Sequence, residues 1–131
     1  MNRLALMEQA TAFFDAFVAA FHTFDGDRIA QRYIAPYLAR NADGSVQCFR
    51  EHAEIGRYFQ DIVNAYRAQG CRSCRYTDLN VVSLGSHSVL ATVTWQLLRA
   101  DGSVLSSWRE SYTLARTESE LRIFASVDHA Q

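Results

Sequence analysis

The chain of 131 residues has the length of one domain with a sizeable hydrophobic core, and we expect a single domain over residues 1–131. Apolar residues make up 49% of the chain and charged residues 21%, which is ordinary for a globular protein. Its 13 basic residues are all Arg, they are scattered, and the formal net charge is −1. Proteins that bind nucleic acid by neutralising phosphates usually carry clustered Lys and Arg, so this composition argues against a nucleic-acid partner.

The N-terminal segment "MNRLALMEQATAFFDAF" does not have the pattern of a secretory signal, because Glu8, Gln9 and Asp15 interrupt its apolar run. No stretch reaches the length of about 20 apolar residues that a bilayer span requires, so we expect no membrane partner. The three Cys residues, an odd number, fit a reducing compartment better than a disulfide framework. We therefore expect a cytoplasmic protein.

The spacing of Cys71 and Cys74 is the one used by many zinc and redox sites. Only Cys48 and His52 offer themselves as further zinc ligands, and on a strand Cys71 and Cys74 would project to opposite faces. A redox pair would normally begin a helix, where the helix dipole lowers the thiol pKa. We expect buried or half-buried thiols here, with no metal and no cofactor.

The first third of the chain is predicted to be helical. Residues 10–24 place one apolar stripe on a helix through four phenylalanines: Phe13, Phe17, Phe21 and Phe24. Asp25 is a suitable N-cap for a second helix over residues 26–35, which we expect Pro36 to end. A third helix is predicted from about Arg50 to Gln69, followed by Gly70 as a C-terminal stop.

Strands are predicted around and after the third helix. Residues 36–49 form a short strand pair around an Asp43-Gly44 turn. After Gly70 the sequence alternates in four runs, separated by "GSHS", Asp101-Gly102 and "TESE": residues 75–84, 89–99, 104–116 and 121–129. Helices followed by an antiparallel meander indicate an α+β fold.

The Asp101-Gly102 turn also predicts the register between the two long strands that it joins. That register makes the following pairs: Trp95 with Trp108, Val93 with Glu110, Ala91 with Tyr112, and Val89 with Leu114. One face of the hairpin is then aromatic and apolar, and the other is rich in Ser and Thr. A slip by one residue would blur both faces. Glu110 is thereby predicted to lie on the aromatic face.

The order of elements resembles the NTF2-like superfamily, which includes SnoaL-like polyketide cyclases, ketosteroid isomerase and limonene-epoxide hydrolase. The segments that carry the resemblance are "FFDAFVAAFHTFDGDRIAQRYIAPY", "FREHAEIGRYFQDI" and "WRESYTLARTESELRIFASVDH". The resemblance covers nearly the whole chain through its apolar spacing. It implies a cone in which three N-terminal helices pack on a curved antiparallel sheet around a pocket, and a homodimer formed through the outer sheet face.

The resemblance does not carry over a set of catalytic residues. Ketosteroid isomerase has a Tyr on its first helix, where this chain offers only phenylalanines: Phe13, Phe14 and Phe17. Asp43 lies near the place of the isomerase base, but in a DG turn it is expected to be a turn former. Near the second isomerase Asp stand Tyr112 and Thr113, with Glu110 as the closest carboxylate.

The hydrolase pattern is matched only in residue types. Limonene-epoxide hydrolase arranges Asp, Arg and Asp around a water, and this chain has Arg109, Glu110 and Asp128. The predicted register puts Arg109 on the face opposite to Glu110. The family therefore predicts the fold and leaves the reaction open.

Glu110 is the candidate catalytic residue. A carboxylate between Trp108 and Tyr112 is desolvated, which raises its pKa toward that of a general acid or base. The alternatives are a structural ion pair with an Arg such as Arg40 or Arg57, or a position on the pocket rim.

The candidate ligand-binding residues are aromatic or polar side chains expected near the pocket: Trp95, Trp108, Tyr112, Tyr33, Tyr37, Asp78 and His129. Asp78 and Asn80 share one strand face with Tyr76, and the register of the preceding loop leaves open whether that face is concave. His129 and Asp128 project to opposite faces, and His129 continues the apolar face of its strand, so we expect His129 rather than Asp128 to face the pocket.

These observations predict a protein that binds a small, largely apolar organic molecule in its cone, with possible general acid–base catalysis of the isomerase, dehydratase or hydrolase type. The alternative is a non-catalytic, homodimeric protein-interaction module in which the pocket is filled. An open cavity reached by Glu110 would favour the first hypothesis, and an ion-paired Glu110 in a packed core would favour the second.

Overall fold

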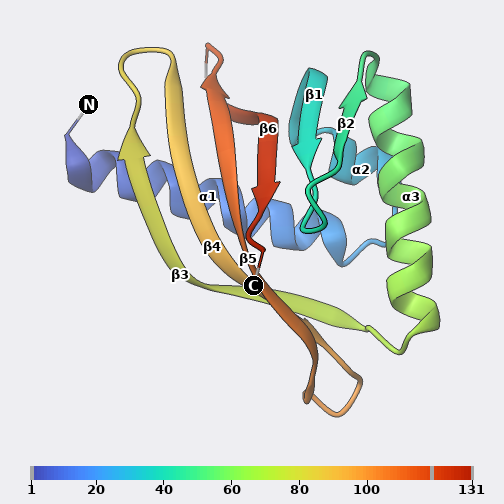
Figure 1. Ribbon diagram of the computed structural model, residues 1–131. Helices are drawn as coiled ribbons and strands as arrows, with labels where there is room; N and C mark the ends of the chain where they lie inside the picture. Colours follow the sequence, from blue (N-terminus) through green and yellow to red (C-terminus); the bar gives the residue numbers. More distant parts are fainter. Residues whose placement is uncertain (1, 119, 131) are drawn as a thin grey trace.

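The computed structural model describes residues 2–118 and 120–130 (Figure 1). The helices in these residues are α1 (Arg3–Phe21), α2 (Gly26–Ala30) and α3 (His52–Ala68). The strands are β1 (Tyr33–Arg40), β2 (Val46–Phe49), β3 (Ser73–Ser83), β4 (Ser88–Leu98), β5 (Val104–Arg116) and β6 (Leu121–Asp128). The α+β fold is thus confirmed; of the turn predicted between β5 and β6, Ser119 lies outside the described residues.

Helix α1 begins earlier than the apolar stripe predicted. The Asn2 side chain caps it by accepting a hydrogen bond of 2.7 Å from the Ala5 amide. Phe14 and Phe17 are fully buried and make tilted or edge-on ring contacts with the sheet. By length and composition this helix could also span a membrane, contrary to the expectation from the sequence. Its Phe stripe nevertheless packs into the core.

The second helix is shorter than predicted, because it ends at Ala30 instead of continuing to Pro36. Pro36 lies inside strand β1, where the pairing with β6 is irregular. Proline has no amide hydrogen to donate to a ladder, so it fits a strand only at such an irregular position. As a result Tyr33, predicted in the helix, joins Tyr37 in the strand, and both tyrosines line the pocket.

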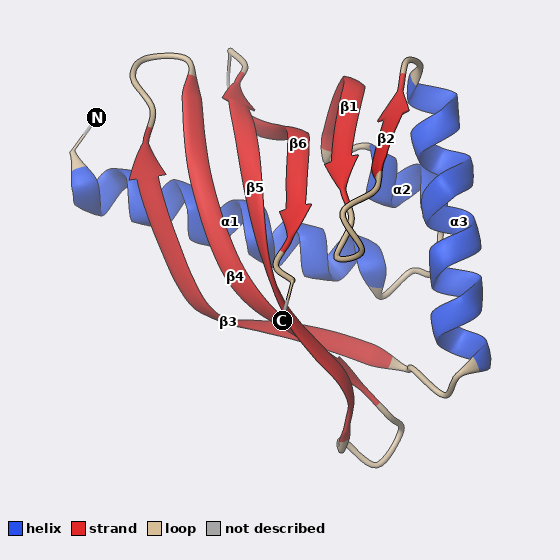
Figure 2. Ribbon diagram, viewed as in Figure 1, coloured by secondary structure: helices blue, strands red, loops and turns tan. Residues whose placement is uncertain are grey.

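The six described strands form one sheet in the order β2-β1-β6-β5-β4-β3. All neighbours are antiparallel except β1 and β6, which are parallel, so the predicted all-antiparallel sheet is wrong at this one pairing. The sheet is strongly curved, α1 crosses one face of it, and α3 stands at the β1–β2 end (Figure 2). The core lies between the helices and this face.

The predicted register between β4 and β5 is confirmed, with Trp95 opposite Trp108 and Val93 opposite Glu110. The turn itself differs from the prediction, because the pairing shifts by one residue between Leu97 and Leu98 and leaves Leu105 unpaired in β5. The hairpin thus combines a longer turn with a bulge, and the bulge restores the predicted register.

Two further bulges reverse the alternation of side chains within a strand. In β3 the shift falls between Thr77 and Asn80, where Asp78 has a positive φ of 55°. In β6 it leaves Phe124 without a partner in β5. A bulge inserts one residue, so side chains beyond it change faces. This reversal decides which polar residues reach the pocket.

Candidate functional site

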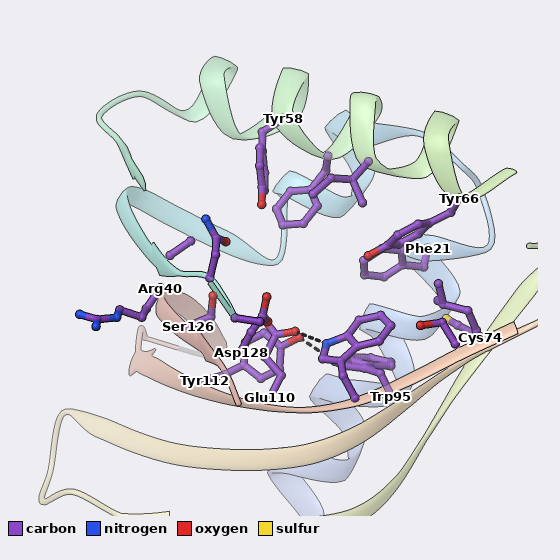
Figure 3. A pocket seen from close by; sticks show the side chains of 18 of the residues that line it. Phe21, Arg40, Tyr58, Tyr66, Cys74, Trp95, Glu110, Tyr112, Ser126 and Asp128 are labelled. Atoms are coloured by element: carbon purple, nitrogen blue, oxygen red, sulfur yellow. Dashed lines mark hydrogen bonds between the residues drawn. The ribbon is translucent and has the colours of Figure 1, made fainter. Parts of the chain in front are cut away.

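A pocket of about 270 Å³ lies between α3 and the inner face of the sheet (Figure 3). It is smaller than the cavities of roughly 300–1,000 Å³ that hold drug-sized ligands. Nine aromatic side chains line it: Phe21, Tyr33, Tyr37, Tyr58, Phe59, Tyr66, Trp95, Trp108 and Tyr112. Such a wall suits a small molecule with a flat, apolar body.

Two carboxyl groups form the polar centre of the pocket. Glu110 on β5 and Asp128 on β6 are directly opposite each other in the antiparallel ladder, and both side chains line the pocket. Figure 3 shows Glu110 and Asp128 side by side on the sheet, facing Tyr58 on α3. Residues directly opposite in such a ladder have neighbouring side chains, so the strand pairing itself brings the two carboxyl groups together.

Two side chains donate hydrogen bonds to Glu110. The Trp108 indole Nε1 lies 2.9 Å from Glu110 Oε1. The Tyr112 hydroxyl bonds to the same carboxyl group and also accepts a bond of 2.7 Å from the Trp95 indole Nε1. Since an indole N–H can only donate, the Tyr112 oxygen accepts from Trp95 and its proton points to Glu110. These contacts fix the position of the Glu110 carboxyl group.

The surroundings of Glu110 favour its protonated form. Burial is the largest cause and the neighbouring Asp128 the second, and together they raise the pKa of Glu110 from 4.5 to about 8. The hydrogen bonds from Trp108 and Tyr112 act in the opposite direction. The carboxyl groups of Glu110 and Asp128 are in hydrogen-bond contact, and the raised pKa of Glu110 keeps a proton on the pair at neutral pH.

Five tyrosines surround this pair, and burial raises the pKa of each, so the phenols stay neutral: Tyr33, Tyr37, Tyr58, Tyr66 and Tyr112. The Tyr37 hydroxyl is engaged with Ser126 Oγ at 2.6 Å. The hydroxyls of Tyr33, Tyr58 and Tyr66 have no hydrogen-bond partner among the described residues. They are free to bind a polar group of a ligand.

All of the residues predicted for the site line this pocket except Asp78. In a regular strand Asp78 would share the inner face of Tyr76, but the bulge at Asp78 turns Leu79 inward instead. Asp78 is therefore exposed, and its carbonyl oxygen accepts a bond from Arg109 on the outer face. Arg109 lies on the opposite face of the sheet from Glu110, as the register predicted.

The prediction that His129 rather than Asp128 faces the pocket is wrong for Asp128, because both residues line the pocket. The bulge at Phe124 turns Ser126 and Asp128 inward and leaves Val127 46% exposed. His129 follows the end of the strand and borders the pocket, but its Nε2 bonds to Ser111 Oγ at 2.8 Å on the outer side.

Among the pocket residues that the sequence did not predict for the site are Tyr58, Tyr66, Ser126 and Asp128. The two tyrosines could have been found, because they are eight residues apart on α3 and therefore share one helix face. Ser126 and Asp128 could not have been found, because the sequence of β6 gives no sign of the bulge at Phe124.

The structure gives no support for a metal or redox site. The described residues contain no group of three His, Cys, Asp or Glu side chains that could hold a metal ion. Cys71 and Cys74 are buried as predicted, and burial raises the pKa of Cys74 to about 12. Such a thiol is a poor nucleophile at neutral pH.

Residues 8–131 match a protein family described as NTF2-like protein (DUF6841). The chain belongs to this family. No curated protein matches the chain. Among solved structures, the protein Aln2 from a Streptomyces species is similar with a TM-score of 0.79 and 18% sequence identity, over 99% of this chain and 94% of that one.

An NTF2-like protein with a cystatin-like fold from Novosphingobium aromaticivorans is similar with a TM-score of 0.75 and 14% identity, over 97% and 82% of the two chains. A putative calcium/calmodulin-dependent protein kinase II association domain from Xanthomonas campestris has a TM-score of 0.67 and 17% identity, over 93% and 85%. At these identities the comparisons establish the NTF2-like fold alone.

Proposed function

We propose that this NTF2-like protein binds a small, largely apolar organic molecule in its pocket, and that the Glu110–Asp128 pair exchanges protons with it. The observation that carries the proposal is the position of the pair, which lies inside an aromatic cavity of about 270 Å³. Polar groups that converge in an otherwise apolar cavity are typical of small-molecule sites.

The chemistry that fits this arrangement is general acid–base catalysis, as in an isomerisation or a dehydration. A pair that holds one proton contains a base and an acid at neutral pH. The carboxylate removes a proton from the ligand, and the carboxylic acid donates one to an oxygen of the ligand, so the pair ends with the same number of protons. The Tyr33 hydroxyl, which lines the same pocket and has no partner among the described residues, would hydrogen-bond that oxygen.

A homodimeric interaction module is the second candidate. The outer sheet face supports it, because Leu38 on β1 and Val127 on the neighbouring β6 are each 46% exposed. The cavity and the position of Glu110 favour ligand binding as the main function. A cytoplasmic homodimer that binds its ligand in each cone would be consistent with both. Sedimentation of the purified protein would test the dimer.

The direct test of the ligand site is a thermal-shift and turnover screen of small cyclic ketones, hydroxy ketones and epoxides. We expect a compound that stabilises or is converted by the wild-type protein to lose that effect with Glu110→Gln and with Asp128→Asn. Glu51→Gln is the matched control, because Glu51 is exposed and its side chain makes no capping bond. A compound that the wild type and both pocket variants handle equally would refute the role of the pair.

A further inference from the structure

The carboxyl pair has no positive partner among the described residues. The ion pairs found there are Arg28 with Asp25 and Arg122 with Glu120, both away from the pocket. Arg40 borders the cavity, but it is exposed and its guanidinium group points away from the pair (Figure 3). Arg57 is exposed and lies outside the pocket lining. The structural ion pair that the sequence left open for Glu110 is therefore not formed by either residue.

An unpartnered hydroxyl group faces the same space. Tyr33 is only 1% exposed and has no hydrogen-bond partner among the described residues. Every side-chain oxygen or nitrogen that is sealed from solvent in the described residues does have a partner. The Tyr33 hydroxyl must therefore open into the pocket, where a buried polar group without a partner is costly unless a ligand or water meets it.

The carboxyl groups of Glu110 and Asp128 can accept more hydrogen bonds than they receive. Glu110 already receives bonds from Trp108 and Tyr112, whereas Asp128 has no hydrogen bond in the described residues apart from its contact with Glu110. A carboxyl group offers about four acceptor positions, so Asp128 can accept further donors. The pocket thus presents free acceptors on Asp128 and Tyr33 within aromatic walls.

We propose that the ligand carries a protonated amine, with Asp128 and Glu110 as its counter-ion and the aromatic side chains around its apolar body. This inference rests on the ligand-binding part of the proposed function, independently of its proton exchange, and names the class of the ligand: a small, primary aralkylamine. The N–H groups of the ammonium ion need several acceptors, and Asp128, Glu110 and the Tyr33 hydroxyl provide them. Aromatic rings beside the carboxyl pair add cation–π attraction.

An anionic or a neutral ligand fits the pocket less well. An anion would meet two carboxyl groups and no inward-pointing cation among the described residues. A neutral ligand would bring no opposite charge to the carboxyl pair and no charged N–H donors to the free acceptors of Asp128. Burial of an ammonium ion is unfavourable unless it is paired and hydrogen-bonded, and the carboxyl pair meets both conditions.

Benzylamine and benzyl alcohol are the probes, because they differ in charge and share the same ring and nearly the same size. In titration calorimetry at pH 7 we expect benzylamine to bind at least tenfold more tightly, the difference that a charge-assisted hydrogen bond provides. With Asp128→Asn and with Glu110→Gln, this preference should fall to threefold or less. The exposed Asp61→Asn variant is the matched control and should keep the preference.

Proton release gives a second readout. An ammonium ion favours the doubly ionised pair, so benzylamine binding at pH 7 should release up to about one proton, measured by titration in buffers of different ionisation enthalpy. The other titratable or charged groups around the pocket are Arg40, His129, Cys74 and the five tyrosines. A His129→Gln variant should release the same number of protons.

The outcomes separate this inference from the proposed function. If benzylamine binds no better than benzyl alcohol, or fails to bind at millimolar concentration, the amine assignment is wrong. If a neutral cyclic compound from the earlier screen then still depends on Glu110, the proposed acid–base site survives. A charge preference that persists in both pocket variants would likewise overturn the amine assignment, provided that circular dichroism shows both variants folded.

Discussion

Carboxyl groups of this protein lie in two contrasting environments, the pocket floor and two surface turns. Asp43 and Asp101 occupy turns with the same local sequence, Ala-Asp-Gly-Ser, and each accepts bonds from the following Ser. The Ser hydroxyl and amide of each turn hold the pKa of its Asp below the usual value. On the pocket floor, burial and Asp128 raise the pKa of Glu110 to about 8.

The ionised carboxylates of the turns stabilise the folded state, whereas ionisation of the carboxyl pair in the pocket destabilises it. A hydrogen-bonded surface carboxylate favours the folded state when ionised. A buried carboxyl group beside a second one disfavours it once both ionise. A buried pair that weakens the fold is expected at a functional site, where activity and stability are often opposed.

The largest expected effect is that Glu110→Gln stabilises the protein at alkaline pH. The folded-state pKa of Glu110 is raised from 4.5 to about 8, so between these pH values the folded protein keeps a proton that the unfolded chain releases, and its stability falls as the pH rises. The full shift corresponds to roughly 5 kcal/mol. Gln keeps the shape of the side chain and removes its charge. Urea denaturation from pH 4.5 to 9 should show the variant gaining stability over the wild type as the pH rises.

The control for this experiment is Glu51→Gln, which removes an exposed carboxylate from the start of α3. This variant should not gain stability over the wild type as the pH rises, because an ionised carboxylate at a helix N-terminus does not weaken the fold. A Glu110→Gln variant that differs from the wild type by a constant amount from pH 4.5 to 9 would contradict the raised pKa.

A smaller effect is expected for Tyr112→Phe. This change removes the acceptor of the Trp95 indole N–H and one donor to Glu110. The unpaired, buried indole should cost roughly 1–3 kcal/mol of stability. The lost donor should raise the pKa of Glu110 further, because the Tyr112 bond lowers it. Carbon-13 NMR of the Glu110 carboxyl group measures the midpoint.

Tyr66→Phe is the matched variant, since Tyr66 lines the pocket but does not hydrogen-bond Glu110. The two variants remove the same atom from different walls of the pocket. An equal pKa of Glu110 in both would mean that the Tyr112 hydroxyl does not hold the carboxyl group in place.

The sequence was sufficient to predict Glu110 and insufficient to predict its partner. The Asp101-Gly102 turn and the alternation of the strands fixed which residues face Glu110, and that register is present. The aromatic residues Trp95 and Tyr112 were predicted for the pocket by the same argument and do line it. Local patterns succeed here because the apolar face permits only one register.

Asp128 was missed because its position depends on a bulge at Phe124, which follows from how β6 fits between β5 and β1. If the side chains alternated regularly from residue 121 onward, Asp128 would point outward. No residue type in this stretch indicates the bulge. The bulge in β3 left a weak signal, since Asp tolerates the positive φ found at Asp78 better than most residues. Tertiary fit thus decides what local propensity leaves open.

The smallest expected effect belongs to the surface turns and has the opposite sign to that of Glu110. The pKa of Asp101 is lowered by the Ser103 hydroxyl and amide, so its contribution to stability is present above its unfolded-state pKa and is lost as the pH falls through the folded-state value. Asp101→Asn should therefore lower the melting temperature slightly at pH 7 and leave it unchanged near pH 2. Asp43→Asn should behave in the same way, because its turn has the same bonds. If a turn variant instead gained stability over the wild type as the pH rises, the predicted opposite pH dependence of the exposed turn carboxylates and the buried Glu110 would be wrong.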